Sequence, residues 1–370
     1  MSSDQRIDYS LNQIYFYLTA ACNLRCRHCW IVPRFQDHGT VQSALEFDLF
    51  RSIVDQAGKL GLSGVKLTGG EPLIHPRIGD IIERIREAGL TLGIETNGVS
   101  LTPQLARAIR ECKNAFVSVS LDGADAETHE WMRGLDGCWR EAIQGVRYLV
   151  EAGLRPQIIM SLVRRNKDQV EAVVGLAESL GAESVKFNIV QPTARGQNMH
   201  GAGETLSIEE LVEMGRWVET DLSHSTNLRL VFSHPPVFRP LSRLLGPAGD
   251  GCSSCGIFGI LGVLADGSYA LCGIGETVPE LVFGSALTDS LEEVWRESAV
   301  LNDIRRGLPA RLTGTCRRCL LKKLCLGECI AQNYYRTKDL WSSYWYCEEA
   351  YAAGLFPKSR IGIANMSDSV

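Results

Sequence analysis

The sequence lacks any segment that would carry the protein into or across a membrane. Its opening residues, from Met1 to Arg6, are polar and contain no apolar core of the kind found in signal peptides. No apolar run in the 370 residues is long enough to span a bilayer. We therefore predict a cytoplasmic protein without a membrane partner.

An excess of charge of one sign is also missing. The 38 basic and 43 acidic side chains are interspersed and give a net charge of −5, so no long-range field would attract nucleic acid or an anionic membrane. Fixed-period repeats and low-complexity stretches are absent as well, which argues against a solenoid or a disordered chain. Because 370 residues exceed one average domain, we expect a large domain with a smaller one attached.

Cysteine, in contrast, is abundant, with thirteen residues. Reducing cytosol rarely sustains structural disulfides, so metal ligation becomes the leading explanation. Three cysteines lie together near the start of the chain, and eight fall between Cys252 and Cys347. The two isolated ones, Cys112 and Cys138, are interpreted as packed or exposed thiols rather than ligands.

Residues 13–190 alternate short β-branched or aromatic runs with longer amphipathic stretches, which is typical of repeated βα units. The short runs are nearly all apolar, as expected for a parallel sheet that is covered on both faces. We predict an α/β fold, a partial (β/α)6 barrel, in which ligands bind at the carboxyl ends of the strands. The predicted strands are residues 13–19, 64–68, 91–96, 115–121, 157–163 and 184–190, and the predicted helices include residues 45–60, 78–88, 103–112, 139–152 and 168–180.

The rest of the chain has a different pattern. A helix is predicted at residues 208–221, followed by a short apolar run at 228–232 and a Pro/Gly-rich linker at 234–251. The turn Asp266-Gly267 then joins residues 257–265 and 268–272 as a hairpin. A helix-like stretch, residues 291–305, leads to the last cysteines. We therefore divide the chain into 1–233, the barrel with a bridging segment, and 234–370, the linker with a cysteine-rich domain.

The first three cysteines are spaced Cys22-x3-Cys26-x2-Cys29 and follow the first predicted strand. This position puts them at the mouth of the proposed barrel. Three thiolates can ligate three irons of a four-iron four-sulfur cube, which leaves the fourth iron open to a substrate. A zinc site completed by His28 or by a distant ligand is the alternative.

This spacing resembles that of the radical S-adenosylmethionine (radical SAM) superfamily. The resemblance implies that the open iron chelates S-adenosylmethionine and that the cluster cleaves it to a 5′-deoxyadenosyl radical, which removes a hydrogen atom from the substrate. The family usually has an aromatic residue before the third cysteine. Here it is His28, which is also planar and able to cover the cluster.

Polar and glycine residues follow the second, third and fourth predicted strands. The motif of the second strand resembles the superfamily's site for the amino group of S-adenosylmethionine, since glycines admit close backbone approach and a carboxylate accepts hydrogen bonds from an ammonium group. The later ones are candidates for the ribose and the methionine carboxylate, with helix capping as the alternative. The residues are Gly69, Gly70, Glu71 and Pro72, then Asn97, and then Ser120 and Asp122.

The fifth and sixth predicted strands supply the remaining candidates. Ser161 ends the fifth strand, and Arg164 follows it as a possible clamp for the carboxylate, although Arg133 or Arg195 would serve equally well. Asn188 on the sixth strand lies where relatives of the superfamily contact adenine. No catalytic residue beyond the cluster is assigned.

The cysteines of the last third of the chain resemble those of the SPASM extension of radical enzymes. That resemblance implies two auxiliary four-iron four-sulfur clusters, and hence three clusters in all; a zinc-ribbon fold is the alternative. Either Cys252 or Cys255 alone satisfies the family spacing, so the first auxiliary cluster has either a complete or an open ligand set. The implied ligands are Cys252, Cys255, Cys272 and Cys329 for one cluster, and Cys316, Cys319, Cys325 and Cys347 for the other.

Relatives with this pair of domains mostly modify peptides or proteins, so the first hypothesis is oxidative maturation of a ribosomally made peptide. Oxidation or decarboxylation of a small molecule such as a tetrapyrrole is the enzymatic alternative, and an iron–sulfur electron carrier or sensor is the non-enzymatic one. We also expect an external electron donor, flavodoxin or ferredoxin, and a separate leader-peptide-binding protein. The aromatic candidates for a peptide-binding surface are Trp131, Trp139, Trp341, Tyr344, Trp345 and Tyr346, with burial in the core as the alternative.

Overall fold

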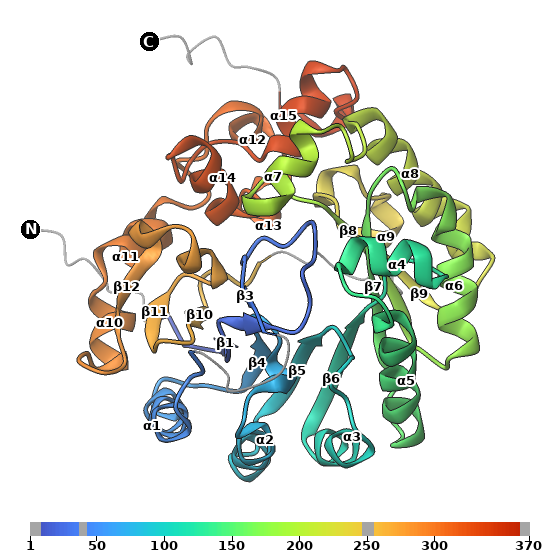
Figure 1. The fold of residues 1–370 in the computed structure, drawn as a ribbon. Helices are drawn as coiled ribbons and strands as arrows, with labels where there is room; N and C mark the ends of the chain where they lie inside the picture. Colours follow the sequence, from blue (N-terminus) through green and yellow to red (C-terminus); the bar gives the residue numbers. More distant parts are fainter. Residues whose placement is uncertain (1–8, 37–42, 246–254, 363–370) are drawn as a thin grey trace, which may run out of the picture.

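A single curved sheet of ten strands forms the centre of the computed structural model, which describes residues 9–36, 43–245 and 255–362 (Figure 1). The strands follow the order β12-β11-β10-β1-β4-β5-β6-β7-β8-β9, and those from β10 to β9 are parallel. Their bounds are β1 Gln13–Tyr17, β4 Gly64–Thr68, β5 Thr91–Thr96, β6 Lys113–Ser120, β7 Gln157–Leu162, β8 Ser184–Ile189, β9 Arg229–Phe232, β10 Ile260–Val263, β11 Ser268–Ala270 and β12 Val282–Ser285.

Helices cover the outer face of this sheet, which confirms the predicted α/β partial barrel (Figure 1). Each of the six predicted strands is present with bounds shifted by at most a few residues. The helices of the barrel are α1 Phe47–Gly58, α2 Ile78–Glu87, α3 Pro103–Arg110, α4 Ala126–Arg133, α5 Cys138–Glu151, α6 Val170–Ser179, α7 Ala194–Gly201 and α8 Ile208–Thr220. Among the described residues, no helix is long and apolar enough to cross a membrane.

The core lies between the sheet and these helices. Successive side chains of a strand point to opposite faces, so Ile14 and Phe16 of β1 are fully buried toward the helices whereas Tyr15 faces the inside of the barrel. Helix α2 presents Ile81 and Ile85 to the same core. Burying one such side chain contributes roughly 1.5–3 kcal/mol, and this repeated alternation fixes which residues reach the inner face.

The C-terminal region continues the barrel wall instead of standing apart from it. Strand β10 of the predicted hairpin pairs in parallel with β1, with Gln13 opposite Ile260. The predicted turn is confirmed, with Gly267 at a φ of 85°. The apolar run at 228–232 is β9 and closes the other edge of the sheet. The division at residue 233 stays a prediction, because the sheet crosses it.

One predicted helix is broken, and three α-helices of residues 9–36 and 43–245 escaped prediction: α4, α7 and α9 (Leu241–Leu245), which falls within the predicted linker. The stretch 291–305 forms α10 (Leu291–Glu297) and α11 (Ala299–Gly307), because Ser298 ends the first and its side chain caps the second by accepting a hydrogen bond from the Leu301 N–H. The short helices α4 and α7 lack a strong apolar period in the sequence. Both lie at the mouth of the barrel, where they contact the cysteine loop described below.

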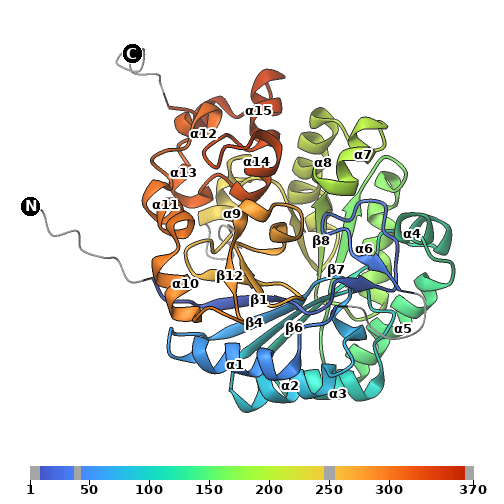
Figure 2. The ribbon, with the colours of Figure 1, turned by 60° about the vertical axis from the view of Figure 1, so that its left-hand side comes forward.

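The remaining helices, α12 (Gly314–Arg318), α13 (Lys322–Cys325), α14 (Ile330–Thr337) and α15 (Trp345–Ala352), form a cap over one side of the sheet (Figure 2). This cap binds the barrel through Gln191, whose side-chain oxygen accepts hydrogen bonds of 2.8 Å from both Tyr344 and Trp345. Four of the six aromatic candidates for a peptide-binding surface are therefore core: Trp341, Tyr344, Trp345 and Tyr346 are all buried. Trp131 and Trp139 remain half-buried.

Two helical glycines give a matched test of this packing. A Cβ on Gly145 of α5 would lie 2.3 Å from the Gly98 carbonyl oxygen, whereas one on the exposed Gly175 of α6 would meet nothing within 4 Å. We expect Gly145→Ala to destabilise the protein by about 1–3 kcal/mol and Gly175→Ala to stabilise it by up to about 1 kcal/mol. Denaturant unfolding of the two variants measures both values, and equal shifts would contradict the packing.

Candidate functional site

The loop that carries Cys22, Cys26 and Cys29 begins where β1 ends and is fixed to the barrel at several points. Residues Ala21–Cys22 form β2, which pairs with β3, Arg34–Phe35. The end of α4 accepts two hydrogen bonds from the loop, from Arg25 N to Arg133 O and from Arg27 N to Met132 O. The predicted position of the three cysteines at the mouth of the barrel is what the structure shows.

The turn after β4 packs directly against this loop. The Gly70 and Glu71 N–H groups donate to the Thr19 and Ala21 carbonyls at 2.8 and 2.9 Å. A Cβ on Gly70 would lie 1.8 Å from the Ala21 oxygen, and Gly69 has a φ of 126°. Only glycine fits both positions, so this pair sets the distance between the turn and the cysteine loop.

Glu71 is buried, and its carboxylate accepts hydrogen bonds within the protein. The donors are Leu73 N at 3.0 Å, Thr96 Oγ1 at 2.6 Å and Asn97 N at 2.8 Å. Burial raises the pKa of Glu71 to about 6, against the effect of these bonds. Pro72 starts the short helix η1 (Pro72–Ile74) that follows. Glu71 thus ties the end of β4 to the end of β5.

Asn97 continues this connection into the cysteine loop. Its side-chain nitrogen Nδ2 donates a hydrogen bond of 2.7 Å to Oδ1 of Asn23 and lies 3.9 Å from the sulfur of Cys22. Its oxygen accepts from Val99 N. The Asn97 side chain therefore contacts the cysteine loop in addition to accepting a local backbone hydrogen bond of the kind expected for a cap.

A buried ion pair lies beside the second cysteine. Arg133, at the end of α4, places Nε 2.6 Å from Oδ2 of Asp122 and Nη1 3.6 Å from the sulfur of Cys26. Asp122 is 0% exposed, and its Oδ1 accepts from Ser161 N at 2.8 Å. The Arg133 guanidinium holds the pKa of Asp122 below its usual value despite the burial. Asp122 therefore faces Arg133, and the expected ribose contact stays a prediction.

The other candidates of the fourth to sixth strands are half-buried or buried at the same mouth. Ser161 Oγ lies 3.3 Å from Nε2 of His28, so β7 touches the loop between its second and third cysteines. Burial lowers the pKa of His28 to about 4. Ser120 ends β6 and is half-buried, and Asn188 accepts a 3.0 Å hydrogen bond from Ser233.

The structure separates the three candidate arginines. Arg164 pairs with Glu210 at the start of α8, at 3.0 Å, and does not reach the cysteine loop. Arg195 donates from its side chain to the Cys26 carbonyl at 3.1 Å and from its backbone to the Cys29 carbonyl at 3.3 Å. Arg133 contacts Cys26 as described. The sequence named all three but could not rank them, because helices α4 and α7, which position two of them, were not predicted.

The second set of cysteines gathers next to the barrel. Cys255, Cys272 and Cys329 line one cavity of about 350 Å³ together with Glu328. Burial raises the pKa of Cys329, and the neighbouring Cys272 and Cys255 thiols raise it further. Cys252, the fourth expected member, lies outside the described residues. The structure thus brings together every member of the expected set that it describes.

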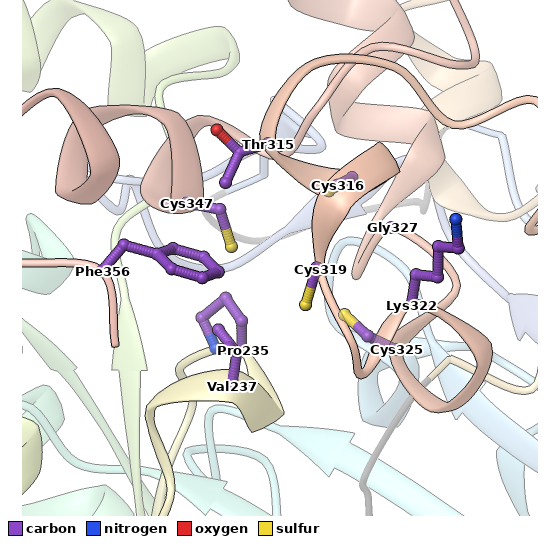
Figure 3. A pocket seen from close by; sticks show the side chains of 10 residues that line it. All are labelled: Pro235, Val237, Thr315, Cys316, Cys319, Lys322, Cys325, Gly327, Cys347 and Phe356. Atoms are coloured by element: carbon purple, nitrogen blue, oxygen red, sulfur yellow. The ribbon is translucent and has the colours of Figure 1, made fainter. Parts of the chain in front are cut away.

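The third set lines a separate cavity of about 300 Å³ in the helical cap. Figure 3 shows the side chains of Cys316, Cys319, Cys325 and Cys347 around this space, together with Pro235 and Phe356. Cys316 and Cys319 come from α12 and its end, Cys325 from α13 and Cys347 from α15. The expected interleaving, in which Cys329 belongs to the other group, is reproduced.

These donor sets fit clusters better than single zinc ions. A tetrahedral zinc site holds four sulfurs at about 2.3 Å from one ion. In residues 9–36, 43–245 and 255–362, no three Cys, His, Asp or Glu side chains converge closely enough to hold one metal ion. Cys112 and Cys138 are both buried; Cys112 belongs to the main apolar core, and Cys138 packs with Cys22, Leu24 and Cys26 of the cysteine loop.

Comparison with known proteins gives the same two-part organisation. Residues 16–177 match the family model of the Radical SAM superfamily, and residues 252–320 match SPASM, an iron–sulfur cluster-binding domain. The chain is 29% identical over 349 residues to an AdoMet-dependent heme synthase of Methanosarcina barkeri, covering 90% of this chain and 95% of that protein. It is 25% identical over 362 residues to the mycofactocin maturase MftC of Mycobacterium ulcerans, covering 93% and 89%.

Among solved structures, the fold is similar to that of Streptococcus suis SuiB. With SuiB bound to its precursor peptide SuiA the TM-score is 0.70 at 17% identity, and the match covers 92% of this chain and 76% of SuiB. With SuiB bound to S-adenosylmethionine the TM-score is 0.71, with coverage of 92% and 78%. At this identity the likeness concerns the fold.

The glycine turn yields a first test of the site. We expect Gly70→Ala to displace the turn from the cysteine loop, because its Cβ would overlap the Ala21 oxygen, and to lower stability by about 1–3 kcal/mol. Gly79→Ala in α2, where a Cβ meets nothing within 4 Å, is the control. Thermal unfolding and iron content after anaerobic reconstitution are measured; a Gly70→Ala variant that matches the control in both would contradict this contact.

The buried ion pair yields a second. Arg133→Met leaves Asp122 charged and fully buried, which costs about 3–5 kcal/mol, whereas Arg164→Met removes an exposed pair worth at most about 1 kcal/mol. Adding Asp122→Asn to Arg133→Met should recover part of the loss. Denaturant unfolding compares the three, and similar values for the two arginine variants would show that the Asp122 pair contributes little.

Proposed function

We propose, from the premise that this chain is a radical SAM enzyme with a C-terminal SPASM domain, that it oxidatively modifies a ribosomally made peptide or protein. The radical SAM domain binds S-adenosylmethionine and a four-iron four-sulfur cluster, and the SPASM domain binds iron–sulfur clusters. When bound, the first cluster and S-adenosylmethionine supply a 5′-deoxyadenosyl radical. The single observation that carries the radical chemistry is the contact of the three-cysteine loop with the glycine turn, and the choice of a peptide rests on the similarity to a peptide maturase.

We assign Cys22, Cys26 and Cys29 as the ligands of the first cluster. Burial and the neighbouring Glu71 carboxylate raise the pKa of Cys22, so its thiolate needs a metal to stabilise it. Gly69 and Gly70 bring backbone to the site without side chains in the way, and Asn97 orients the loop through Asn23. Arg133 or Arg195 is assigned as the partner of the methionine carboxylate, since both contact the cysteine loop.

A substrate that loses one hydrogen atom must also lose one electron to become a closed-shell product. Cys255 precedes β10 and Cys272 follows β11, and β10 pairs with β1, the strand that carries Tyr15 on the inner face of the sheet. We therefore place the acceptor of that electron at the Cys255, Cys272 and Cys329 group, and assign the second auxiliary cluster to the four cysteines of the helical cap. An external donor such as ferredoxin or flavodoxin returns the first cluster to its reduced state.

A peptide substrate is supported by the similarity to the mycofactocin maturase over 93% of this chain. A tetrapyrrole is the second candidate, favoured by the similarity to the heme synthase over 95% of that protein's length. Recognition of a peptide would need the barrel mouth, where Trp131 is half-buried beside Arg27 and Arg165, or a separate leader-binding protein. The aromatic residues of the cap do not contribute to it, because they are buried.

Anaerobic reconstitution tests the radical chemistry. The protein should bind about twelve iron atoms and form 5′-deoxyadenosine when it is reduced with S-adenosylmethionine, and replacing Cys22, Cys26 and Cys29 with alanine should leave about eight irons. The Cys112→Ala variant, which removes a packed thiol outside the three groups, is the control. Intact clusters without any formation of 5′-deoxyadenosine would contradict the assignment of the protein as a radical SAM enzyme.

Co-expression tests the substrate. Short reading frames encoded beside the gene are expressed with the enzyme, and each peptide is weighed by mass spectrometry. We expect one peptide to lose hydrogen with the wild-type enzyme and to stay unchanged with the three-alanine variant. A parallel assay with a porphyrin that bears propionates measures carbon dioxide and vinyl products; turnover there and not on any peptide would replace the peptide by the second candidate.

A further inference from the structure

Four polar side chains lie on the inner face of the curved sheet, away from the helices. They are Tyr15 of β1, Lys66 of β4, Glu95 of β5 and Lys186 of β8, and the strand neighbours of each are buried. We call these residues the inner-face group. Lys66 Nζ pairs with Glu95 Oε1 at 2.5 Å, and the Tyr15 ring centroid lies 4.9 Å from the same nitrogen.

Lys186 is the member of this group without a partner. It forms no hydrogen bond and no ion pair with any other residue in the described ranges, and the charges that act on it most strongly belong to Glu95, Lys66, Glu328 and Arg239. Glu95 is already paired with Lys66, Arg239 repels Lys186, and Glu328 attracts it without forming an ion pair with it. A half-buried ammonium group without a directly paired anion is costly, so this position suits a ligand that supplies one.

The neighbours of Lys186 place it between two of the cysteine groups. On one side it is coupled to Glu328, which lines the cavity of Cys255, Cys272 and Cys329. On the other side, Asn188 follows Lys186 by two residues on the same strand and lies opposite Ser161 of β7. Ser161 in turn contacts His28 of the three-cysteine loop. Two residues of a strand span about 7 Å.

The Lys66–Glu95 pair is accessible to solvent. The two side chains are 25% and 39% exposed although they lie within the curve of the sheet, so other side chains do not fill this face completely. The charge limits what a ligand of this face can be. Lys66, Glu95 and Lys186 together carry one positive charge, and the Glu328 carboxylate offsets it, so a dianionic phosphate is disfavoured relative to a single carboxylate.

We propose that Lys186 binds a carboxylate group of the substrate and thereby places the adjoining carbon between the three-cysteine loop and the Cys255, Cys272 and Cys329 group. In a peptide this group is an acidic side chain or the C-terminal carboxylate. That the substrate is a peptide rests on the proposed function. That Lys186 binds a carboxylate rests only on the inner-face group. It makes Lys186 a residue that selects the substrate.

The rate at which Lys186 is acetylated measures whether a carboxylate binds to it, and this experiment needs no known substrate. Burial lowers the pKa of Lys186, and a bound carboxylate raises it again and slows its reaction as a free amine. The reconstituted enzyme is pulsed with acetic anhydride in the presence of N-acetyl-glutamate N-methylamide or its glutamine counterpart, and acetylation is quantified by mass spectrometry. Lys167, which pairs with Glu210 away from the inner face, is the internal control.

We expect the glutamate probe, and not the glutamine probe, to slow acetylation of Lys186 while leaving Lys167 unchanged. A second arm uses a porphyrin bearing propionates and its methyl ester. If only the porphyrin with free propionates protects Lys186 from acetylation, the carboxylate site is supported, but the proposal that a peptide supplies the carboxylate is overturned. Protection by neither acid would overturn the carboxylate site itself, whatever the outcome of the co-expression experiment.

Kinetics with the peptide or porphyrin identified above gives the second readout. Lys186→Met should raise KM about tenfold to hundredfold, as expected for a lost charged hydrogen bond, with a smaller change in kcat. Lys167→Met removes a lysine from the surface and should change neither. Replacing the substrate's carboxylate by an amide should raise KM for the wild-type enzyme. The same replacement should not raise the KM of the Lys186→Met variant any further. Additive losses, or an unchanged KM in the lysine variant, would overturn the proposal.

Discussion

The site depends on a backbone contact that tolerates no side chain. The turn after β4 donates two N–H groups to the carbonyls of the cysteine loop, and this approach is possible only because residue 70 has no Cβ. Once the turn is in place, Glu71 joins it to β5 and Asn97 joins β5 back to the loop. The loop thus receives its shape from the sheet behind it.

Much of this was predictable from residue patterns, since strands that are apolar throughout and separated by amphipathic stretches have few alternatives to a parallel sheet. The division of the cysteines into three groups followed from the resemblance of their spacing to the radical SAM and SPASM patterns. What escaped prediction depends on distant partners: helices α4 and α7 are short and weakly amphipathic, and the pairing of β10 with β1 joins segments about 250 residues apart. The roles of Asp122 and Arg164 illustrate this, because each side chain is paired with a residue whose position no local pattern indicates.

The inner face of the sheet adjoins the C-terminal region, because β1 pairs with β10. Tyr15 and Lys66 are influenced by Cys255, and Lys186 by Glu328, so charges on three strands of the barrel act on the C-terminal region directly. The Gln191 hydrogen bonds to Tyr344 and Trp345 hold the helical cap at a fixed position over one side of the sheet.

The central position of β1 has a consequence for synthesis on the ribosome. This strand is made first, pairs with β4 about 50 residues later, and gains its other neighbour only when β10 emerges near residue 260. Throughout that interval its second edge carries unpaired backbone groups, a template for wrong pairing with other chains. Such long-range closure is slow, so the nascent barrel waits for the C-terminal half, and neither half presents a finished sheet without the other.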